Sequence, residues 1–336
     1  MKPVVRFGLD LAKRSFSVAG ADAHSNIILR ETLKRHQLLP FFVQRPPAMV
    51  AMESGSGAHH WARELISLGH DARIIDPRRV APYRPQGRTG KNDINDAIAI
   101  CEAASRPNMR FVPVKSIEQQ TILTVHRLRH AAVVTHTQTI NRMRGLLAEF
   151  GVVVPRGADT FKRRWRELRI DPDPNIPQLT WQVLDELFDE LHQIHRKILG
   201  YDRQIRQFVK NDERAIRLLT IHGIGEKTAA AIVAMIGNGR DFKNGRQFAA
   251  WVGLTPRQYT TGGKPRLGGI TKRGDTYLRT LLIHGARSVL VRAATRDDST
   301  SRWASNLLKR KSWNQAAVAV ANKNARMAWA VLAKSD

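Results

Sequence analysis

The chain has 336 residues, of which 42% are hydrophobic and 25% charged, so it is long enough for two domains and is not compositionally disordered. Lys and Arg number 55 against 29 Asp and Glu, a net charge of +26 with a pI of about 11.2. This surplus predicts a polyanionic partner, with nucleic acid ahead of an anionic membrane. The C-terminal third, residues 216–336, holds 21 basic and 6 acidic residues and is expected to form the main polyanion-binding surface.

Cysteine content and hydropathy exclude two further classes. The single cysteine, Cys101, lies in an apolar run that predicts a helix, so we expect a core residue in a reducing compartment. No apolar run approaches the ~18 residues of a membrane span, and the N-terminus lacks the apolar core of a signal peptide. We therefore expect a cytoplasmic protein without membrane contact.

The first part of the chain alternates strand and helix signals. Predicted strands cover residues 4–11, 15–21, 27–29, 48–52 and 72–75, of which the first three form an antiparallel meander. A basic loop with glycine, residues 84–92, leads to a helix over 93–104 for which Asn92 is the expected N-cap. Residues 1–112 are therefore predicted to form an α/β domain with a mixed sheet.

Two long helical patterns follow, over residues 117–150 and 177–212, with an irregular segment expected between them at 151–175. Such a pair predicts an antiparallel helical hairpin, a coiled-coil arm within residues 113–214. The second helix carries an apolar stripe that should pack on a partner. An internal spacer and a dimerisation arm are equally favoured. The stripe consists of Leu184, Leu187, Leu191, Ile194, Ile198, Ile205 and Phe208.

The last domain, residues 215–336, is predicted to be mainly helical and basic. Its helices are expected near residues 245–251, 275–292, 301–309 and 313–332. Before them, Gly223-Ile224-Gly225 resembles a helix-hairpin-helix turn, which presents N–H groups to one DNA phosphate, with Lys227 as a neighbouring cation. A plain connection between two helices is the alternative.

Four acids stand where they can meet at one edge of the sheet. Asp10 and Glu53 each follow an apolar strand, and Asp93 and Asp96 project from one face of a first helical turn. Carboxylates gathered in this way repel one another, and two Mg²⁺ ions about 3.5–4 Å apart are a common solution for phosphodiester chemistry. As an alternative, Asp93 and Asp96 only favour the helix dipole. The order of the four acids favours a metal site, with Mn²⁺ as the second choice of ion.

A second candidate site lies in residues 253–274, where hydroxyls stand beside a glycine pair and basic residues. Glycines let backbone N–H groups approach a phosphate, and the cations neutralise it. A hydroxyl held there could attack phosphorus and form a covalent phosphoester. On the residues alone, a plain phosphate-binding loop is favoured over a nucleophile. The residues concerned are Thr260, Thr261, Gly262, Gly263, Lys264, Arg266, Lys272 and Arg273.

The chain resembles the DEDD transposases of bacterial insertion sequences, which are bridge-RNA-guided recombinases. The resemblance rests on residues 8–13, 52–56, 91–97 and 253–279 and extends over essentially the full chain. It implies a RuvC-like domain of the RNase H fold that holds Mg²⁺ through the four acids. It also implies a coiled-coil hairpin for oligomer assembly and a C-terminal transposase domain that supplies a nucleophilic hydroxyl.

The implied partners are donor and target DNA, a structured guide RNA and further copies of the chain, as a dimer or tetramer. Strand exchange would pass through protein–DNA phosphoesters, with the hydroxyl of one subunit completing the acidic site of another. In the family this hydroxyl belongs to a serine, and the matching residue here is Thr260, with Thr261 as the second choice. Threonine keeps the hydroxyl but adds a methyl group that crowds its attack.

We therefore expect a transposase that recombines DNA by Mg²⁺-assisted phosphoryl transfer. One alternative is a RuvC-like endonuclease in which the metal site activates water and no covalent intermediate forms. Another is a non-catalytic scaffold that binds RNA or DNA and keeps only a relic of the acidic site.

Overall fold

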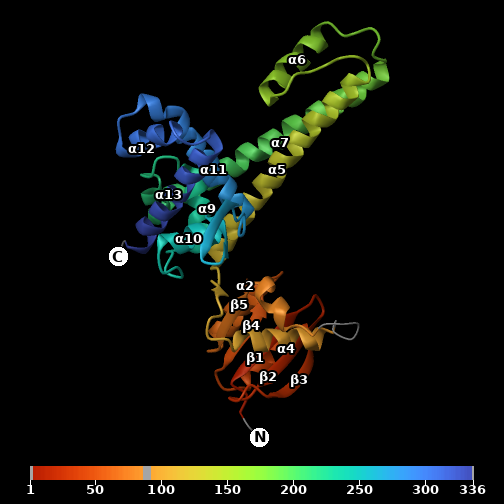
Figure 1. Ribbon diagram of the computed structural model, residues 1–336. Coiled ribbons are helices and arrows are strands. Elements are labelled where there is room, and N and C mark those ends of the chain that lie inside the picture. Colours follow the sequence, from red (N-terminus) through yellow and green to blue (C-terminus); the bar gives the residue numbers. More distant parts are fainter. Residues whose placement is uncertain (1–2, 86–91, 335–336) are drawn as a thin grey trace. The chain divides into compact units, whose positions relative to one another are not determined.

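The computed structural model describes residues 3–85 and 92–334. The expected basic loop over 84–92, including Lys91, therefore lies mostly outside the described residues. The chain divides into two compact units, Met1–Ile117 and Glu118–Asp336 (Figure 1). The helical arm and the C-terminal helices belong to the same unit, so the predicted separation of these two parts at residue 214 stays a prediction.

The first unit is built on a six-stranded mixed sheet with the strand order β3-β2-β1-β4-β5-β6. The strands are β1 (Arg6–Leu11), β2 (Ser15–Ala21), β3 (Ile27–Lys34), β4 (Met49–Glu53), β5 (Asp71–Ile75) and β6 (Phe111–Val112). β1, β2 and β3 pair antiparallel, as the predicted meander requires, whereas β4 runs parallel to both β1 and β5. This mixed α/β arrangement agrees with the expectation of an RNase H-like domain.

Helices cover both faces of this sheet, because its central strands β1 and β4 bury residues on both sides. The helical segments are η1 (Arg35–Gln37), α1 (Leu38–Val43), α2 (Ala58–Ser67), α3 (Pro77–Val80), η2 (Ala81–Tyr83) and α4 (Asp93–Ala104). α1 and α2 pack on the face that carries Phe7 and Leu9, and α4 packs on the opposite face. Cys101, a residue of α4, is fully buried, as predicted.

α4 lies unusually close to β1 because Gly8 has no side chain. A methyl group on Gly8 would lie 2.1 Å from the carbonyl oxygen of Ala97 and 2.5 Å from the backbone nitrogen of Cys101. Only glycine permits this approach of helix to strand. Gly8 therefore admits the backbone of α4, and this contact brings the first turn of α4 toward the end of β1.

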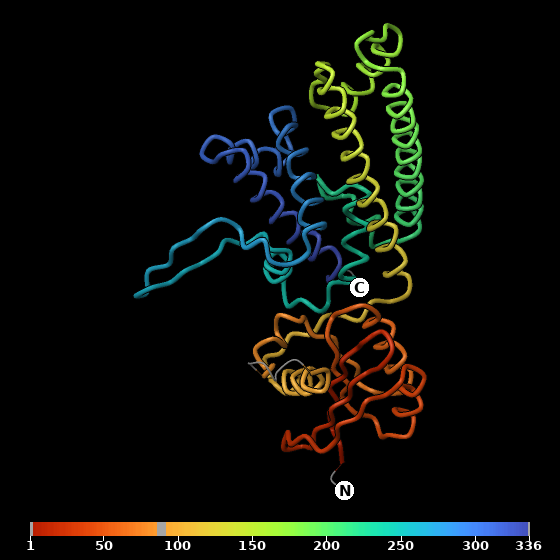
Figure 2. The backbone as a smooth tube through the Cα atoms, turned by 90° about the vertical axis from the view of Figure 1, so that its right-hand side faces the viewer, coloured from red at the N-terminus to blue at the C-terminus, as the bar shows by residue number. Residues whose placement is uncertain are grey.

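The second unit contains two long helices, α5 (Ile117–Ala148) and α7 (Gln178–Asn211), which run side by side in opposite directions (Figures 1 and 2). The sequence analysis expected an irregular segment between them. This expectation is wrong, because the segment contains α6 (Ala158–Ile170). The abundant Arg and Lys residues of α6 hide a short apolar face. Phe161, Trp165 and Leu168 on this face are buried against α5 and α7.

The predicted apolar stripe of α7 is covered largely within the chain. Leu184 and Leu191 are buried in the cluster that α5, α6 and α7 form. Ile205 and Phe208, near the other end of the helix, join the core of the C-terminal helices. The hairpin therefore has intramolecular partners along much of its length, and its role in oligomer assembly stays a proposal.

The C-terminal part is mainly helical, as predicted, but it also holds an unforeseen β-hairpin. The helices are α8 (Glu213–Leu218), α9 (Glu226–Ile236), α10 (Gly245–Val252), α11 (Thr276–Arg292), η3 (Ala293–Thr295), α12 (Ser299–Leu308) and α13 (Trp313–Ala333). The hairpin pairs β7 (Pro256–Thr261) with β8 (Lys264–Ile270) and extends away from these helices (Figure 2). Within the described part of the chain, no helix has the length and apolar character needed to cross a membrane.

The close packing at Gly8 gives a first testable prediction. In Gly8→Ala the added methyl group would push α4 from β1, and overpacking of this kind lowers the free energy of unfolding by about 3 kcal/mol. Amide hydrogen exchange of the full chain should show lost protection in β1 and α4. Gly55→Ala is the control, because the nearest atom to its new methyl group is 3.9 Å away. Unchanged protection in Gly8→Ala would contradict the packing described here.

Candidate functional site

The topology of the first unit brings the four predicted acids to one region. Asp10 follows Leu9 on β1 and Glu53 follows Met52 on β4, and the parallel register pairs Leu9 with Met52. Because side chains alternate along a strand, Asp10 shares the face of Gly8, on which α4 packs.

The helix supplies the other two acids. Asp93 and Asp96 lie in the first turn of α4, which is capped by the side chain of Asn92 accepting a hydrogen bond from the Ile94 N–H. This confirms the predicted cap. The acids thus come from two neighbouring strands and one helix start, all held by backbone packing.

The pKa of Asp10 records the proximity of the other three acids. Burial, together with the negative charges of Asp96, Asp93 and Glu53, raises this pKa from the ordinary value of 3.8 to about 6, while Arg84 opposes the rise. Burial likewise raises the pKa of Glu53, against the opposing effect of Arg84. The cluster therefore holds more negative charge than its surroundings neutralise.

Arg84 supplies the positive charge within this cluster. Its Nη2 donates a hydrogen bond of 2.5 Å to Oε1 of Glu53, and its Nε lies 2.7 Å from Oδ1 of Asp96. The Nε–H is not directed for a hydrogen bond, so its contact with Asp96 is an ion pair only. One guanidinium thus bridges an acid of β4 and an acid of α4. Sequence reasoning missed this residue because nothing in the pattern distinguishes it from the other arginines nearby.

The chemistry of the four side chains suits a divalent ion, although the distances between their carboxylate groups are too long to hold one in this structure. The donors are all carboxylate oxygens, which Mg²⁺ and Mn²⁺ prefer, and one carboxyl has its pKa raised by burial and by the others. Among the described residues, however, no three acidic, histidine or cysteine side chains stand close enough together to hold an ion. Arg84 separates Glu53 and Asp96 in this state.

The second candidate site, with its two threonine hydroxyls, lies on the β7–β8 hairpin. All residues of β7 are exposed, as are those of β8 except its last. Gly262 and Gly263 form the two-residue turn with φ values of 57° and 76°, a conformation that favours glycine at both positions. The predicted loop is thus a strand pair whose tip presents Thr260 and Thr261 without covering side chains.

The register of the hairpin separates these two hydroxyls. Thr261 pairs with Lys264 and Tyr259 with Arg266, so these four side chains share one face. Thr260 pairs with Pro265 on the other face, where its Oγ1 accepts a hydrogen bond of 3.2 Å from Nε2 of Gln258. The cationic face of the hairpin is therefore the face of Thr261.

The foot of the hairpin is rigidly held. A methyl group on Gly253 would lie 2.0 Å from the carbonyl oxygen of Arg273, so the chain segments before and after the hairpin are in direct backbone contact. The buried Arg279 donates a hydrogen bond of 2.9 Å to the Val252 carbonyl. The side chains of Lys272 and Arg273 are exposed beside this contact. The hairpin therefore extends from a foot whose backbone is fixed by these contacts.

The Gly223-Ile224-Gly225 turn connects α8 and α9, as predicted, but one side of it is buried. A methyl group on Gly223 would lie 2.8 Å from the Gly285 carbonyl oxygen, and Nδ2 of Asn324 donates a hydrogen bond of 2.9 Å to the His222 carbonyl. Gly225 faces open space. Phosphate binding by this turn stays a prediction, and among the two glycines only Gly225 has room for a ligand.

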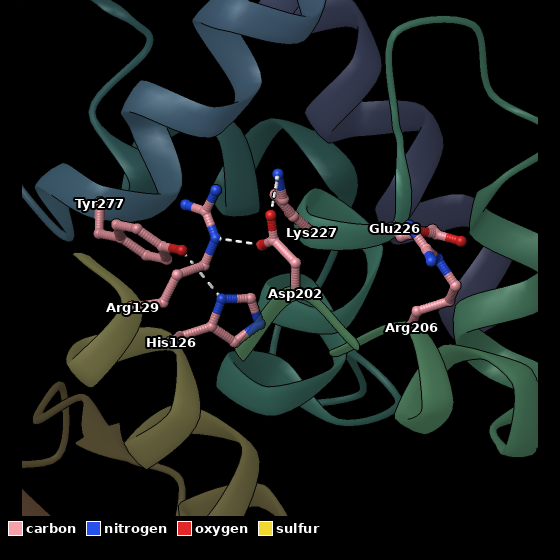
Figure 3. A network of polar contacts seen from close by, with 7 residues as sticks. All are labelled: His126, Arg129, Asp202, Arg206, Glu226, Lys227 and Tyr277. Atoms are coloured by element: carbon pink, nitrogen blue, oxygen red, sulfur yellow. Dashed lines mark hydrogen bonds and ion pairs between the residues drawn. The ribbon is translucent and has the colours of Figure 1, made fainter. Parts of the chain in front are cut away.

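Lys227 takes part in a polar network that joins four helices (Figure 3). Its Nζ lies 3.1 Å from Oδ2 of Asp202 on α7, and Arg129 of α5 donates a hydrogen bond to the same carboxylate. Next to them, Nδ1 of His126 is 2.9 Å from the Tyr277 hydroxyl at the start of α11. The network anchors the arm to the helix that follows the hairpin. Lys227 thus has a structural role, whereas its predicted role in nucleic-acid binding stays a prediction.

His126 is a buried member of this network. Burial, together with the positive charge of Arg129, lowers its pKa from 6.5 to about 4, so the imidazole is neutral at neutral pH. Sequence reasoning missed His126, Asp202 and Tyr277 because their contacts join residues far apart in the chain. Spacing along a single helix carries no signal of such contacts.

Comparisons with known proteins find matches over both parts of the chain. A transposase family model, of the DEDD type of IS110, matches residues 7–151, and a second, described as Transposase IS116/IS110/IS902 family, matches residues 215–302. A probable family 20 transposase of Pseudomonas aeruginosa is 50% identical over 98% of this chain and 97% of its own length. The transposase for insertion sequence element IS1328 of Yersinia enterocolitica is 39% identical over 98% of this chain and 97% of its own. The transposase for IS1111A of Coxiella burnetii is 37% identical over 100% and 92%.

The raised pKa of Asp10 predicts how the metal-free protein responds to pH. A carboxyl whose pKa is higher in the folded than in the unfolded state lowers stability as pH rises from about 4 to 6, and this loss persists above pH 6. In EDTA at pH 7.5, Asp10→Asn should therefore raise the free energy of unfolding of the first unit by about 1–2 kcal/mol, allowing for partial exposure. At pH 4 the gain should vanish.

Amide hydrogen exchange of β1 and β4 in the full chain measures this effect. Glu102→Gln provides the control, since it removes an exposed carboxylate of α4 that pairs with Arg106. This variant should bring no such gain. A destabilised Asp10→Asn at pH 7.5 would show that the other acids do not repel Asp10 in the folded protein.

Proposed function

Because this chain belongs to the IS116/IS110/IS902 family of transposases, enzymes that cut and rejoin DNA, we propose that it acts by metal-assisted phosphoryl transfer through a covalent protein–DNA intermediate. The observation that carries this proposal is the cluster of Asp10, Glu53, Asp93 and Asp96. Burial and the charges of the other three acids raise the pKa of Asp10, and Arg84 is the cation among them. Such a cluster is adapted to divalent ions.

Mg²⁺, or Mn²⁺ in its place, would be held by the four carboxylates. When bound, such ions neutralise the charge that develops on phosphate oxygens and lower the pKa of an attacking hydroxyl. Arg84 would have to release Glu53 or Asp96 first, because its guanidinium now occupies the space between them. The role of this chain's carboxylates is to fix the position of the positive charge beside the phosphate.

The nucleophile we propose is a threonine hydroxyl at the tip of the hairpin. Its oxygen forms a bond to phosphorus while the bond from phosphorus to one bridging oxygen of the DNA breaks. The hydroxyl proton passes to a carboxylate of the cluster, and the freed DNA oxygen takes up a proton to become a hydroxyl. Attack of another DNA end on the phosphothreonine reverses these steps and rejoins the strands.

Two threonines are available, and the hairpin register distinguishes them. Thr260 matches the family's serine in the sequence analysis and remains a candidate. Thr261 has the better surroundings, because Lys264 and Arg266 on its face can hold the phosphate under attack. We therefore favour Thr261 on electrostatic grounds. Lys272 and Arg273, exposed at the foot of the hairpin, would bind flanking phosphates.

The acids and the hydroxyls belong to different units of the chain. A single reaction needs both, so we propose that a homo-oligomer combines the acids of one copy with the hairpin of another. The net charge of +15 over residues 216–336 suits binding of donor and target DNA and equally of a structured guide RNA. A guide would carry the sequence specificity by base pairing.

The covalent intermediate is tested by the wild-type protein with its co-purified RNA and labelled DNA that spans an element junction. Denaturing gels should show a DNA–protein adduct in Mg²⁺ and none in EDTA. Thr261→Ala should abolish the adduct, because no other aliphatic hydroxyl shares the face of Lys264 and Arg266, whereas Thr260→Ala should retain at least a tenth of the wild-type rate. The reverse result would return the role to Thr260.

Cleavage in Mg²⁺ without any adduct would replace this proposal by a metal-dependent endonuclease. In that reaction the acidic cluster would activate water, and the hairpin would only hold phosphate. DNA binding with neither cleavage nor adduct would leave a binding scaffold.

Arg84 allows the metal site to be tested without catalysis. In Arg84→Ala the cluster loses its internal cation, so its affinity for Mn²⁺ should rise by about tenfold, measured by electron paramagnetic resonance of free Mn²⁺. Arg73→Ala is the matched control, since Arg73 pairs with Asp71 at the start of β5, whereas Glu53 lies beside the other end of that strand, and it should leave the affinity unchanged. A fall in affinity in Arg84→Ala would mean that Arg84 helps to build the metal site rather than occupying it.

A further inference from the structure

A groove in the second unit has features that the hairpin and the acidic cluster do not explain. Its volume is about 940 Å³, and it is bounded by α10, α12, α13 and the foot of the β7–β8 hairpin. Pro256 and Ile270, which pair with each other at the foot of the hairpin, line one edge of it. The groove is formed entirely within the second unit.

The charged side chains of this groove are all positive. Arg246, Lys323, Arg326 and Lys334 line it, and no acidic residue does. None of the ion pairs among the described residues of the C-terminal helices involves Arg246, Lys323 or Arg326. A hollow with several cations that lack a carboxylate partner is suited to an anionic ligand.

The floor of the groove is apolar and aromatic. Trp303, Met327 and Trp329 contribute to it, and the Lys323 ammonium lies 4.5 Å from the centre of the Trp303 ring. Trp329 is fixed in orientation, because its Nε1 donates a hydrogen bond of 3.0 Å to the Gly239 carbonyl. The groove thus combines flat apolar surfaces with cations, which is the composition that binds unpaired bases and the phosphates between them.

We propose that this groove binds a single-stranded segment of nucleic acid. Lys323, Arg326 and Arg246 bind its phosphates, and an unpaired base lies on the apolar floor beside Trp303. A duplex cannot make the same contacts with the apolar floor, because its bases are stacked on one another and have no free face. Single-stranded DNA and RNA share this chemistry.

Continuity with the hairpin favours nucleic acid over an acidic peptide. Residues 256–270 contain Arg257, Lys264 and Arg266 and no acid, so one basic track leads from the hairpin tip to the groove. The six residues from Pro256 to Thr261 span about 17 Å, five steps at the usual rise of a strand. A strand whose phosphate is attacked at the tip can therefore extend into the groove. In this respect the inference rests on the proposed function, because the same strand serves both sites.

The test measures binding alone, in EDTA, so that failure of the proposed chemistry does not affect it. The probes are fluorescent 12-nucleotide single strands of DNA and RNA containing 5-iodouracil, together with the DNA duplex of the same sequence. The variant Lys323→Glu/Arg326→Glu changes the groove. Lys309→Glu/Arg310→Glu makes the same change of charge on exposed side chains outside the groove.

We expect Lys323→Glu/Arg326→Glu to lower single-strand affinity at least tenfold and to leave duplex affinity within threefold of that of the control variant. Loss of two phosphate contacts should also reduce the slope of log affinity against log salt by about 1.4, at roughly 0.7 per phosphate for single strands. Ultraviolet light should cross-link the wild-type protein to 5-iodouracil at Trp303 or Met327. Comparison of DNA and RNA then identifies the natural strand.

Three results would overturn the inference. The first is an equal loss of affinity in both double variants, which would indicate general charge attraction. The second is cross-linking confined to residues outside the groove. The third is displacement of the oligonucleotide by a polyglutamate peptide at equal charge, which would show that the groove recognises charge without bases. If binding behaves as expected but no adduct ever forms in Mg²⁺, the groove stands and the proposed function fails.

Discussion

Mutual repulsion of four carboxylates is the constraint on which the rest of this structure depends. The sheet places Asp10 and Glu53 on neighbouring strands, and the missing side chain of Gly8 lets α4 bring Asp93 and Asp96 up to them. Such an arrangement costs stability at neutral pH, as the raised pKa of Asp10 indicates. Carboxyl groups with perturbed pKa values cluster at functional sites, where a bound ligand can restore the balance of charge.

In the absence of a metal ion, Arg84 reduces the electrostatic repulsion within the cluster. It contacts Glu53 and Asp96 together, which limits the repulsion but leaves Asp10 with a raised pKa. One guanidinium carries a single positive charge, whereas the two divalent ions of the proposed site would carry four. The exchange of Arg84 for metal would thus couple ion binding to a local rearrangement at the edge of the sheet.

The sequence predicted the elements of the first unit well because their signals are local. Apolar alternation marks β1 and β2, Asn92 marks the start of α4, and the order of the four acids indicates a shared site. Features that depend on contacts between distant residues were not foreseen. Arg84 is one example.

Two other misses have different physical reasons. α6 was taken for an irregular segment, because its many cations mask a face of only three buried residues. Strands β7 and β8 have no buried face, so no hydrophobic pattern in the sequence could predict them. Only the pair Gly262-Gly263, a favoured two-residue turn, carried a hairpin signal, and it was interpreted as a phosphate loop. The register that separates Thr260 from Thr261 follows from that hairpin and could not be derived without it.

The central claim is that the acids of the first unit and a hydroxyl of the hairpin act on the same phosphate. The most direct measurement is single-turnover adduct formation by Asp10→Asn, which keeps both threonines, alongside its equilibrium affinity for the same DNA. The account predicts unchanged affinity and an adduct rate at least about a hundredfold below that of the wild type, since the acids are needed in the transition state. Adduct formation at the wild-type rate would contradict it, because the hydroxyl would then react without the acidic cluster.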